Sequence, residues 1–306
     1  MNSPKHILLT IDVEDWFQVE NFKPWIPFST WDQRELRVEK NVHRLLDLFD
    51  SIELPSFPAS GPPSSTPSQL QAERRPKATF FVLGWIAERL PGIVREIQSR
   101  GHEIASHGCH HELPELLSVD ELKQDLTASK KLLEDITGAE AVGYRAPSFS
   151  INDDLLKTIQ DSGYRYDSSY NSFSLHGRYG KVSLNGSGKK GIAHKLSDNF
   201  YEFPISNFRF GGLTFPLGGG GYFRLLPFSV FNWGIKLILK RQNAYMFYVH
   251  PWEIDPGQPR VEKASVGFKF RHYRNLGKTY SRLRELIANF NSCNFSTCNQ
   301  YLDELV

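Results

Sequence analysis

Short apolar segments alternate with helical segments along the chain, and this alternation constrains the fold more than any other feature. β-Branched and apolar runs that predict buried strands are 6–12, 78–84, 102–107, 142–147, 164–169 and 245–250. Helical apolar spacing is found at 38–49, 85–100, 118–137, 153–162, 228–240 and 278–290. Strands that alternate with helices form parallel sheets, so we expect an α/β barrel or a doubly wound sheet.

Length and composition suit one α/β barrel domain spanning 1–306. The chain has 306 residues, is 40% hydrophobic and carries a net charge of only +2. This near balance argues against a dedicated nucleic-acid-binding protein. The stretch 53–77 is rich in Pro and Ser without periodicity, which predicts a flexible surface insertion rather than a domain boundary.

The three cysteines and the N-terminus predict a cytoplasmic location. The cysteine count is odd and contains no CxxC pair, which is typical of a reducing compartment. Residues 1–6 run into the first predicted strand without the apolar stretch of a signal peptide. No run is apolar and long enough to predict a transmembrane helix.

Polar side chains cluster where the predicted strands end. In parallel α/β folds, sites collect at the C-terminal ends of strands. The clusters are Asp12/Glu14/Asp15, His107/His111, Arg145, Asp167 and His250. We therefore ask whether these five clusters meet at one rim of the sheet.

Two histidines and one acid in these clusters predict a divalent metal site. His107 and His111 are four residues apart, and side chains with this spacing share a face on a helical turn. An equally plausible alternative is a surface histidine pair. If the first strand continues to Glu14, then Asp12 and Glu14 point the same way; if it ends at Asp12, then Asp15 can turn inward instead. Of the neighbouring histidines, we interpret His102 as structural and leave His110 out.

Other residues offer supporting chemistry. Arg145 can hold a carboxylate through two N–H groups. Asp167 can orient a histidine. His250 follows an apolar strand, where a buried structural histidine is the alternative. The glycine run 218–221 lacks the phosphate-loop pattern, so we interpret it as a close-approach loop near substrate.

The order of five motifs resembles the polysaccharide deacetylase family, also called the NodB homology or carbohydrate esterase 4 group. The motifs are LTIDVEDWF (9–17), GHEIASHGCHH (101–111), GYRAPSFS (143–150), YDSS (166–169) and YVHPWEIDP (248–256). The resemblance is closest to the branch without a signal peptide that is linked to exopolysaccharide synthesis. The segments GGGGYFRLLP and FRHYRNLGKTYSRLREL resemble the C-terminal extension of that branch, in about 200–306.

The resemblance implies a distorted (β/α)7-type barrel and a role for each cluster. Asp12 would be the general base, held by Arg145, and His250 the general acid, supported by Asp167. The backbone N–H of Ser148 would stabilise the oxyanion. His107 and His111 would be metal ligands. Aromatic residues that suit sugar faces are Trp16, Tyr222 and Trp252.

The acidic ligand is ambiguous, because the chain departs from the TFDDG form of the family. Val13 follows Asp12, so the ligand must be Glu14 or Asp15. The metal would be Zn²⁺, with Ni²⁺, Co²⁺ or Mn²⁺ as alternatives. The implied reaction is hydrolysis of N-acetyl groups on an amino-sugar polysaccharide or oligosaccharide, with release of acetate. Alternatives are ring opening of a cyclic amide such as allantoin, and a non-catalytic carbohydrate-binding role.

Overall fold

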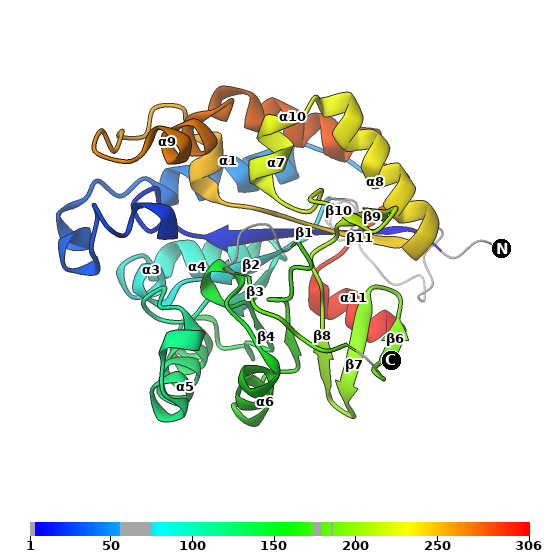
Figure 1. Cartoon of the computed structure of the whole chain (residues 1–306), viewed down its shortest axis with the longest axis horizontal. Coiled ribbons are helices and arrows are strands. Elements are labelled where there is room, and N and C mark those ends of the chain that lie inside the picture. Colours follow the sequence, from blue (N-terminus) through cyan, green and yellow to red (C-terminus); the bar gives the residue numbers. More distant parts are fainter. Residues whose placement is uncertain (1–3, 56–74, 174–178, 185) are drawn as a thin grey trace.

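A sheet of parallel strands forms the centre of the molecule (Figure 1). The computed structural model describes residues 4–55, 75–173, 179–184 and 186–306. The parallel strands lie in the order β11-β1-β2-β3-β4-β5-β8. Their bounds are β1 His6–Val13, β2 Ala78–Val82, β3 Glu103–Ser106, β4 Gly143–Tyr144, β5 Tyr166–Asp167, β8 Phe200–Glu202 and β11 Ala244–Val249. The predicted α/β class with a parallel sheet is confirmed.

The sheet curls into an open, distorted barrel. Among the described residues, no ladder pairing joins the end strands β8 and β11. Loop segments close this gap instead: the backbone N–H of Met246 donates to Ser206 Oγ at 2.9 Å, and the N–H of Tyr248 donates to the carbonyl of Gly218 at 2.8 Å. These bonds satisfy β11 backbone groups that a closed barrel would pair with a strand.

Helices cover the outside of the curled sheet (Figure 1). On one side lie α3 Gly84–Arg89, α4 Pro91–Ser99, α5 Val119–Thr137 and α6 Asp153–Asp161; on the other lie α1 Val38–Asp50, α7 Gly220–Leu225, α8 Phe228–Gln242, α9 Val266–Tyr273 and α10 Leu276–Asn289. α11 Cys298–Leu305 lies beside the antiparallel end of the sheet. No helix in the described ranges is long and apolar enough to cross a membrane.

Local sequence signals explain where these helices begin and end. Ser118 forms a capping box with Glu121, and Gly138 ends α5 with φ +66°. The sequence predicts a helix over 85–100 with a restart near Pro91, and the structure confirms the restart. Pro91 has no N–H to continue the helix and begins a new one, so the segment divides into α3 and α4.

Further strands extend the sheet or stand apart from it. β6 Gly188–Lys190 and β7 Ala193–Ser197 pair antiparallel beside β8, and β12 Asn294–Phe295 pairs with β1. β9 Phe208–Phe210 and β10 Leu213–Phe215 form a separate two-stranded hairpin. Most of the predicted insertion, at 56–74, lies outside the described residues.

Strand β1 positions the site. All of its residues are buried, and it pairs with β11 on one side and β2 on the other. Just beyond its C-terminal end, the N–H of Glu14 donates to the carbonyl of Asp12 at 2.9 Å. This tight turn places Asp12, Glu14 and Asp15 at the rim where the neighbouring strands also end.

Candidate metal centre and active site

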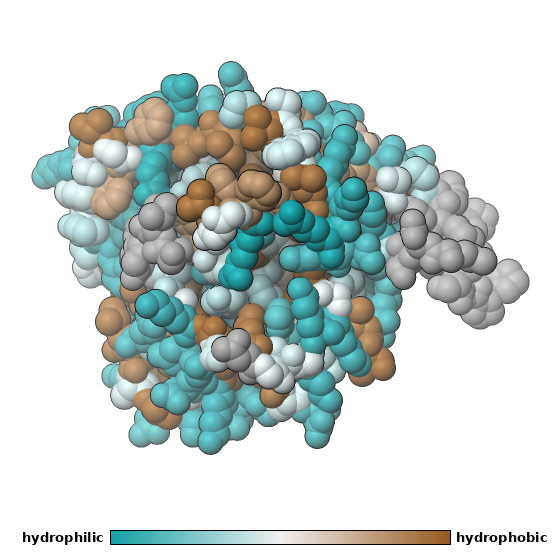
Figure 2. All heavy atoms as spheres, turned by 45° about the vertical axis from the view of Figure 1, so that its right-hand side comes forward, coloured by the Kyte–Doolittle hydropathy of each residue, from teal (hydrophilic) through white to brown (hydrophobic). Residues whose placement is uncertain are grey.

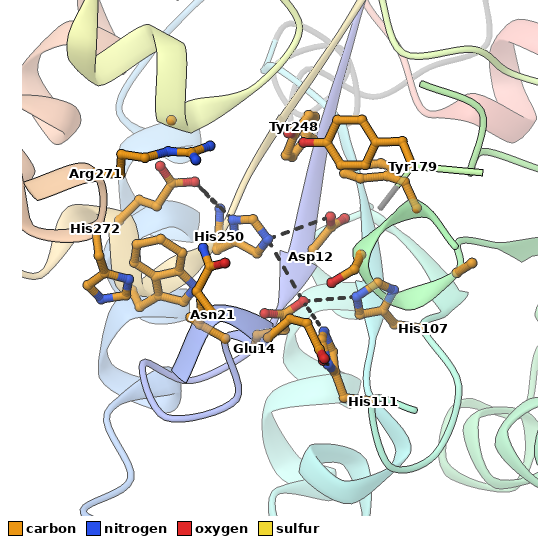
Figure 3. A pocket seen from close by; sticks show the side chains of 18 of the residues that line it. Asp12, Glu14, Asn21, His107, His111, Tyr179, Tyr248, His250, Arg271 and His272 are labelled. Atoms are coloured by element: carbon orange, nitrogen blue, oxygen red, sulfur yellow. Dashed lines mark hydrogen bonds and ion pairs between the residues drawn. The ribbon is translucent and has the colours of Figure 1, made fainter. Parts of the chain in front are cut away.

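Three buried side chains converge on one point at this rim (Figure 3). Glu14 Oε1 lies 3.0 Å from Nε2 of His107 and 2.9 Å from Nε2 of His111. The three ligand atoms all lie within 4.8 Å of one another. One carboxylate and two imidazoles are a donor set typical of Zn²⁺ and similar divalent ions.

A loop, not a helical turn, brings the two histidines together. His107 follows β3, and its N–H donates to the carbonyl of Val82 at 3.0 Å. The chain then turns through Gly108 (φ +72°) and reaches His111, itself in the left-handed region (φ +56°). The left-handed conformation of a non-glycine residue costs about 1 kcal/mol or more, so the surrounding contacts must hold His111 in this position.

The hydrogen bonds of His107 fix which nitrogen faces the centre. Its Nδ1 lies 2.7 Å from the carbonyl oxygen of Arg145, which can only accept a hydrogen bond. Nδ1 therefore carries the proton, and Nε2 presents its lone pair to Glu14 and His111. Two imidazoles and a carboxylate that share one buried point fit a bound cation, and the residues present are therefore suited to a metal ion.

The electrostatics around Glu14 agree with this arrangement. Burial raises the pKa of Glu14, but the charges of His111 and His250 outweigh it and hold the pKa well below its usual range. Glu14 is therefore an ionised carboxylate inside the protein. A buried negative charge of this kind requires a positive or strongly hydrogen-bonding partner.

Asp15 lies close by but faces away from the metal centre, so the alternative of Asp15 as the ligand is wrong for this structure. Its carboxylate accepts backbone N–H groups from Trp16 at 2.8 Å, Arg37 at 2.6 Å and Val38 at 2.8 Å. Two of these groups belong to the start of α1. Asp15 thus supports the N-terminus of that helix, where a carboxylate is favourable.

Asp12 is held by Arg145, as the resemblance implies. Arg145 Nη1 lies 2.6 Å from Asp12 Oδ1, and both side chains are buried. The guanidinium also donates to Thr10 Oγ1 and to both oxygens of Ser168, and it stacks 4.1 Å from the ring centre of Phe81. One Asp12 oxygen is therefore fixed, and Oδ2 faces His250.

His250 points into the same space from the end of β11 (Figure 3). Its Nε2 lies 3.9 Å from Asp12 Oδ2 and 3.8 Å from Glu14 Oε1. Its Nδ1 lies 2.9 Å from Oε1 of Glu253, and the other carboxylate oxygen, Oε2, accepts from Arg224 Nε at 2.7 Å. Burial alone would lower the pKa of His250, but the negative charges of Glu14, Glu253 and Asp12 outweigh burial and raise the pKa to about 9.

Glu253 takes the position that the sequence assigned to Asp167, and the predicted Asp167–His250 support is wrong. The Asp167 carboxylate accepts from the N–H and the hydroxyl of Ser169 at 2.8 and 2.7 Å. The reason is local: Asp167 pairs in register with Glu202 on β8, and its carboxylate is turned toward Ser169 and Glu202 rather than toward His250. The signal for Glu253 was the HPWE motif, because Glu253 caps the short turn that His250 begins.

The three predicted aromatic contacts have different outcomes. Trp252 lines the pocket and stacks on His250, with ring centres 5.2 Å apart. Trp16 is a core residue whose indole N–H donates to the carbonyl of Glu35, so its predicted role at the substrate is wrong. Tyr222 packs edge-on against Phe173 and is not among the lining residues, although its neighbour Gly221 is.

The rest of the pocket wall comes from loops and from the C-terminal half. Ser148 lines it in a left-handed conformation (φ +53°). The glycine run does approach closely: a Cβ on Gly220 would lie 2.2 Å from Glu253 Oε1, and one on Gly219 would lie 2.4 Å from the Tyr248 ring. Wall residues that the sequence did not single out are Asn21, Tyr179, Tyr248, Arg271 and His272.

The fold and site thus define an α/β protein whose rim combines a metal-ligand set, a held carboxylate and a held histidine. Residues 60–166 match the polysaccharide deacetylase family model, and residues 168–303 match a domain of unknown function named DUF3473. His250, Glu253 and Arg224 all lie in the second segment.

Individual relatives agree with the family match. A peptidoglycan-N-acetylglucosamine deacetylase of Bacillus cereus is 35% identical over 105 residues, covering 34% of this chain and 49% of the relative. A chitooligosaccharide deacetylase of Azorhizobium caulinodans is 32% identical over 133 residues, covering 42% of this chain and 59% of the relative. The chain thus spans about half the length of these relatives.

A solved structure agrees with the fold. A crystal structure from Mycobacterium smegmatis, titled as a polysaccharide deacetylase, aligns over 100% of this chain and 92% of that one, with a TM-score of 0.60 and 20% identity. This structural likeness shows the fold, and the family match over residues 60–166 together with the two relatives supports the resemblance to polysaccharide deacetylases that the motifs indicate.

Proposed function

We propose that this protein is a metal-dependent hydrolase that removes N-acetyl groups from an amino-sugar polysaccharide or oligosaccharide. One observation supports the proposal most strongly. The metal-ligand set and the Asp12 carboxylate both lie beside His250 in one pocket: His250 Nε2 is 3.8 Å from Glu14 and 3.9 Å from Asp12. The relatives named above act on peptidoglycan and chitooligosaccharides, both of which contain N-acetylated amino sugars.

Glu14, His107 and His111 would hold the metal ion. When bound, a divalent ion supplies Lewis-acid polarisation of the amide carbonyl and lowers the pKa of the attacking water. The protein supplies the remaining steps. Asp12 accepts the proton of the attacking water through Oδ2, because Arg145 occupies Oδ1.

Charge that develops on the carbonyl oxygen needs a donor on the opposite side of the pocket. The backbone N–H of Ser148, which lines the pocket, is the proposed donor. Loss of one such donor typically costs about 3 kcal/mol of transition-state stabilisation. His250 then gives the proton on Nε2 to the departing amine, which leaves poorly as an anion. Glu253 accepts from Nδ1 and keeps the ring oriented for this transfer.

Acetate release tests the proposal directly. Purified protein loaded with Zn²⁺ should release acetate from chitooligosaccharides or peptidoglycan fragments, and the Asp12→Asn variant should bind metal equally but release acetate at least 10²-fold more slowly. Ring opening of allantoin without acetate release from any amino-sugar polymer would favour the cyclic-amide alternative. Sugar binding without either reaction would favour a non-catalytic role.

A further inference from the structure

The hairpin of β9 and β10 exposes an apolar face on the side of the molecule formed with α8. Phe208 pairs with Phe215 and Phe210 pairs with Leu213, so these four side chains share one face of the hairpin. Gly211 and Gly212, with φ +56° and +78°, make the turn between them. Phe210 is 67% exposed and Leu213 is 64% exposed. Two large apolar side chains at the tip of an isolated hairpin are unfavourable in water.

Helix α8 continues this apolar surface. Trp233 is 60% exposed and its ring centre lies 6.4 Å from that of Phe208, and Val230, one turn earlier, is 47% exposed. Figure 2 brings this side of the molecule forward and shows hydrophobic side chains beside a band of hydrophilic ones. We call Val230, Trp233, Phe210, Leu213 and Phe215 the apolar patch.

The charges next to the apolar patch have one sign. The whole chain is nearly balanced, yet 203–252 contains no Asp or Glu. Its basic residues on this side are Arg209, Lys236, Lys240 and Arg241, which are all exposed. In the described part of the chain, none of the four forms an ion pair with an acidic residue.

A cleft beside the hairpin concentrates the same charge. It encloses about 480 Å³ and is lined by Lys189, Arg209 and Arg241, together with polar groups such as His194 and Asn207. None of its described lining residues is acidic. Arg241 is held at the cleft by donating to the carbonyl of Arg209 at 2.9 Å and by stacking on the Phe208 ring at 4.9 Å. Clustered guanidinium and ammonium groups of this kind suit phosphate oxygens.

From these observations we propose that the apolar patch and the basic cleft form a peripheral docking site for an anionic phospholipid membrane. The hairpin tip and Trp233 enter the boundary between headgroups and acyl chains, and the basic side chains contact headgroup phosphates. A basic cleft alone would suit any soluble anion, and an apolar patch alone would suit a protein partner. The apolar patch and the basic cleft lie side by side with no acidic residue between them. This arrangement favours a binding partner that is both apolar and anionic, as an anionic membrane is.

Vesicle sedimentation tests the proposal and does not depend on catalysis. At 0.1 M NaCl, the full chain should partition at least tenfold more strongly onto vesicles with 30 mol% phosphatidylglycerol than onto pure phosphatidylcholine, and 0.5 M NaCl should weaken this binding. The Phe210→Ser/Leu213→Ser variant should lose at least tenfold in partition. The Lys236→Gln/Lys240→Gln variant should lose about fivefold for each lysine.

Matched controls separate this site from the rest of the surface. Leu116 is 75% exposed and Lys123 is exposed, both away from the hairpin, so Leu116→Ser and Lys123→Gln should bind vesicles as the wild type does. The tryptophan fluorescence of Trp233 is obtained as the difference between the wild type and the Trp233→Phe variant. Brominated lipids should quench this difference. If the hairpin variant fails to fold, the lysine variant and the Trp233 quenching still decide the question.

Three results would overturn the proposal. One is equal partition onto the neutral and anionic vesicles. Another is binding of soluble dextran sulfate that depends on the lysines but not on Phe210 and Leu213, which would assign the face to a soluble polyanion. The third is a dimer of the wild type in size-exclusion chromatography that the hairpin variant abolishes without any vesicle binding, which would assign the patch to a second copy of the chain.

Discussion

Nδ1 of His250 lies 2.9 Å from Oε1 of Glu253, three residues later in the chain, and the same carboxylate is anchored by Arg224 at 2.7 Å. Burial raises the pKa of Glu253, but Arg224 and His250 outweigh it and bring the pKa to about 2. Glu253 is therefore an ionised acceptor at neutral pH. It fixes the proton of His250 on Nδ1 and directs Nε2 to Asp12 and Glu14.

Replacing Glu253 by Gln should slow turnover without emptying the metal site. Glutamine lacks the negative charge with which Glu253 helps to raise the pKa of His250, so less of the imidazole carries protons on both nitrogens and less can give up the Nε2 proton as an acid. We expect kcat to fall by about 10²-fold, within the range typical of a general acid, while the zinc content is unchanged. Steady-state kinetics with metal analysis measures both.

Asp167→Asn is the matched comparison for this variant. Asp167 contacts Ser169 and not His250, so we expect Asp167→Asn to lower kcat far less than Glu253→Gln does in protein of equal fold and metal content. A larger loss in Asp167→Asn than in Glu253→Gln would return the supporting role to Asp167.

Glu14 and Asp15 should separate metal affinity from stability. Glu14→Gln removes an anionic ligand, and we expect zinc affinity to fall at least 10²-fold. Asp15→Asn keeps the ligand set and should bind zinc normally. Its side chain accepts the three backbone N–H groups less well, so we expect its free energy of unfolding to be about 1–3 kcal/mol lower than that of the wild type. Zinc titration and urea unfolding of both variants measure the difference. Equal zinc affinity in Glu14→Gln and wild type would contradict the proposed ligand set.

The sequence predicts correctly those rim residues that directly follow a predicted strand. Asp12, His107, Arg145 and His250 each follow an apolar run, and parallel pairing brings those ends together whatever the details of the loops. The choice of Glu14 over Asp15 could not be made in this way. It depends on the start of α1, 22 residues beyond Asp15, whose N–H groups draw Asp15 away from the centre.

The partner of His250 was missed for a related reason. The sequence analysis assigned the support to Asp167, whereas the HPWE motif places Glu253 in the turn that His250 begins, and the structure shows that the Asp167 carboxylate is bound to Ser169. The hairpin of β9 and β10 was equally difficult to place. Apolar residues recur at 200–215 with a spacing that is typical of strands. This pattern does not show that the strands at 208–215 leave the main sheet and expose their apolar face.

Trp252 should contribute to substrate binding through its N–H group. The side chain is buried at the pocket wall between His250 and His272, whose ring centre lies 4.2 Å away, and Nε1 has no hydrogen-bond partner within the described residues. Trp252→Phe keeps an aromatic ring beside His250 but removes this donor. We expect KM for a chitooligosaccharide to rise about fivefold or more with kcat nearly unchanged, since one hydrogen bond contributes about 1 kcal/mol. An unchanged KM would assign Trp252 a purely structural role.

His102 should make the folded state sensitive to acid. Its Nδ1 accepts the backbone N–H of Ala78 at 3.2 Å, and burial, followed by the positive charge of Lys77, lowers its pKa from 6.5 to about 3. Between these two values the unfolded chain binds a proton that the folded protein does not. This contribution to stability is therefore complete above about pH 6.5 and is lost as the pH falls from 6.5 toward 3.

A variant without this imidazole should lose part of the acid sensitivity. For a shift of this size we expect the wild type to lose about 2 kcal/mol of unfolding free energy from His102 alone between pH 7 and pH 5. His102→Gln retains an acceptor for the Ala78 N–H but does not titrate in this range. Urea unfolding at both pH values should show a loss that is smaller in His102→Gln by about this amount, whatever the absolute stability of the variant. Identical losses in the two proteins would mean that His102 stays neutral in both states or is charged in both.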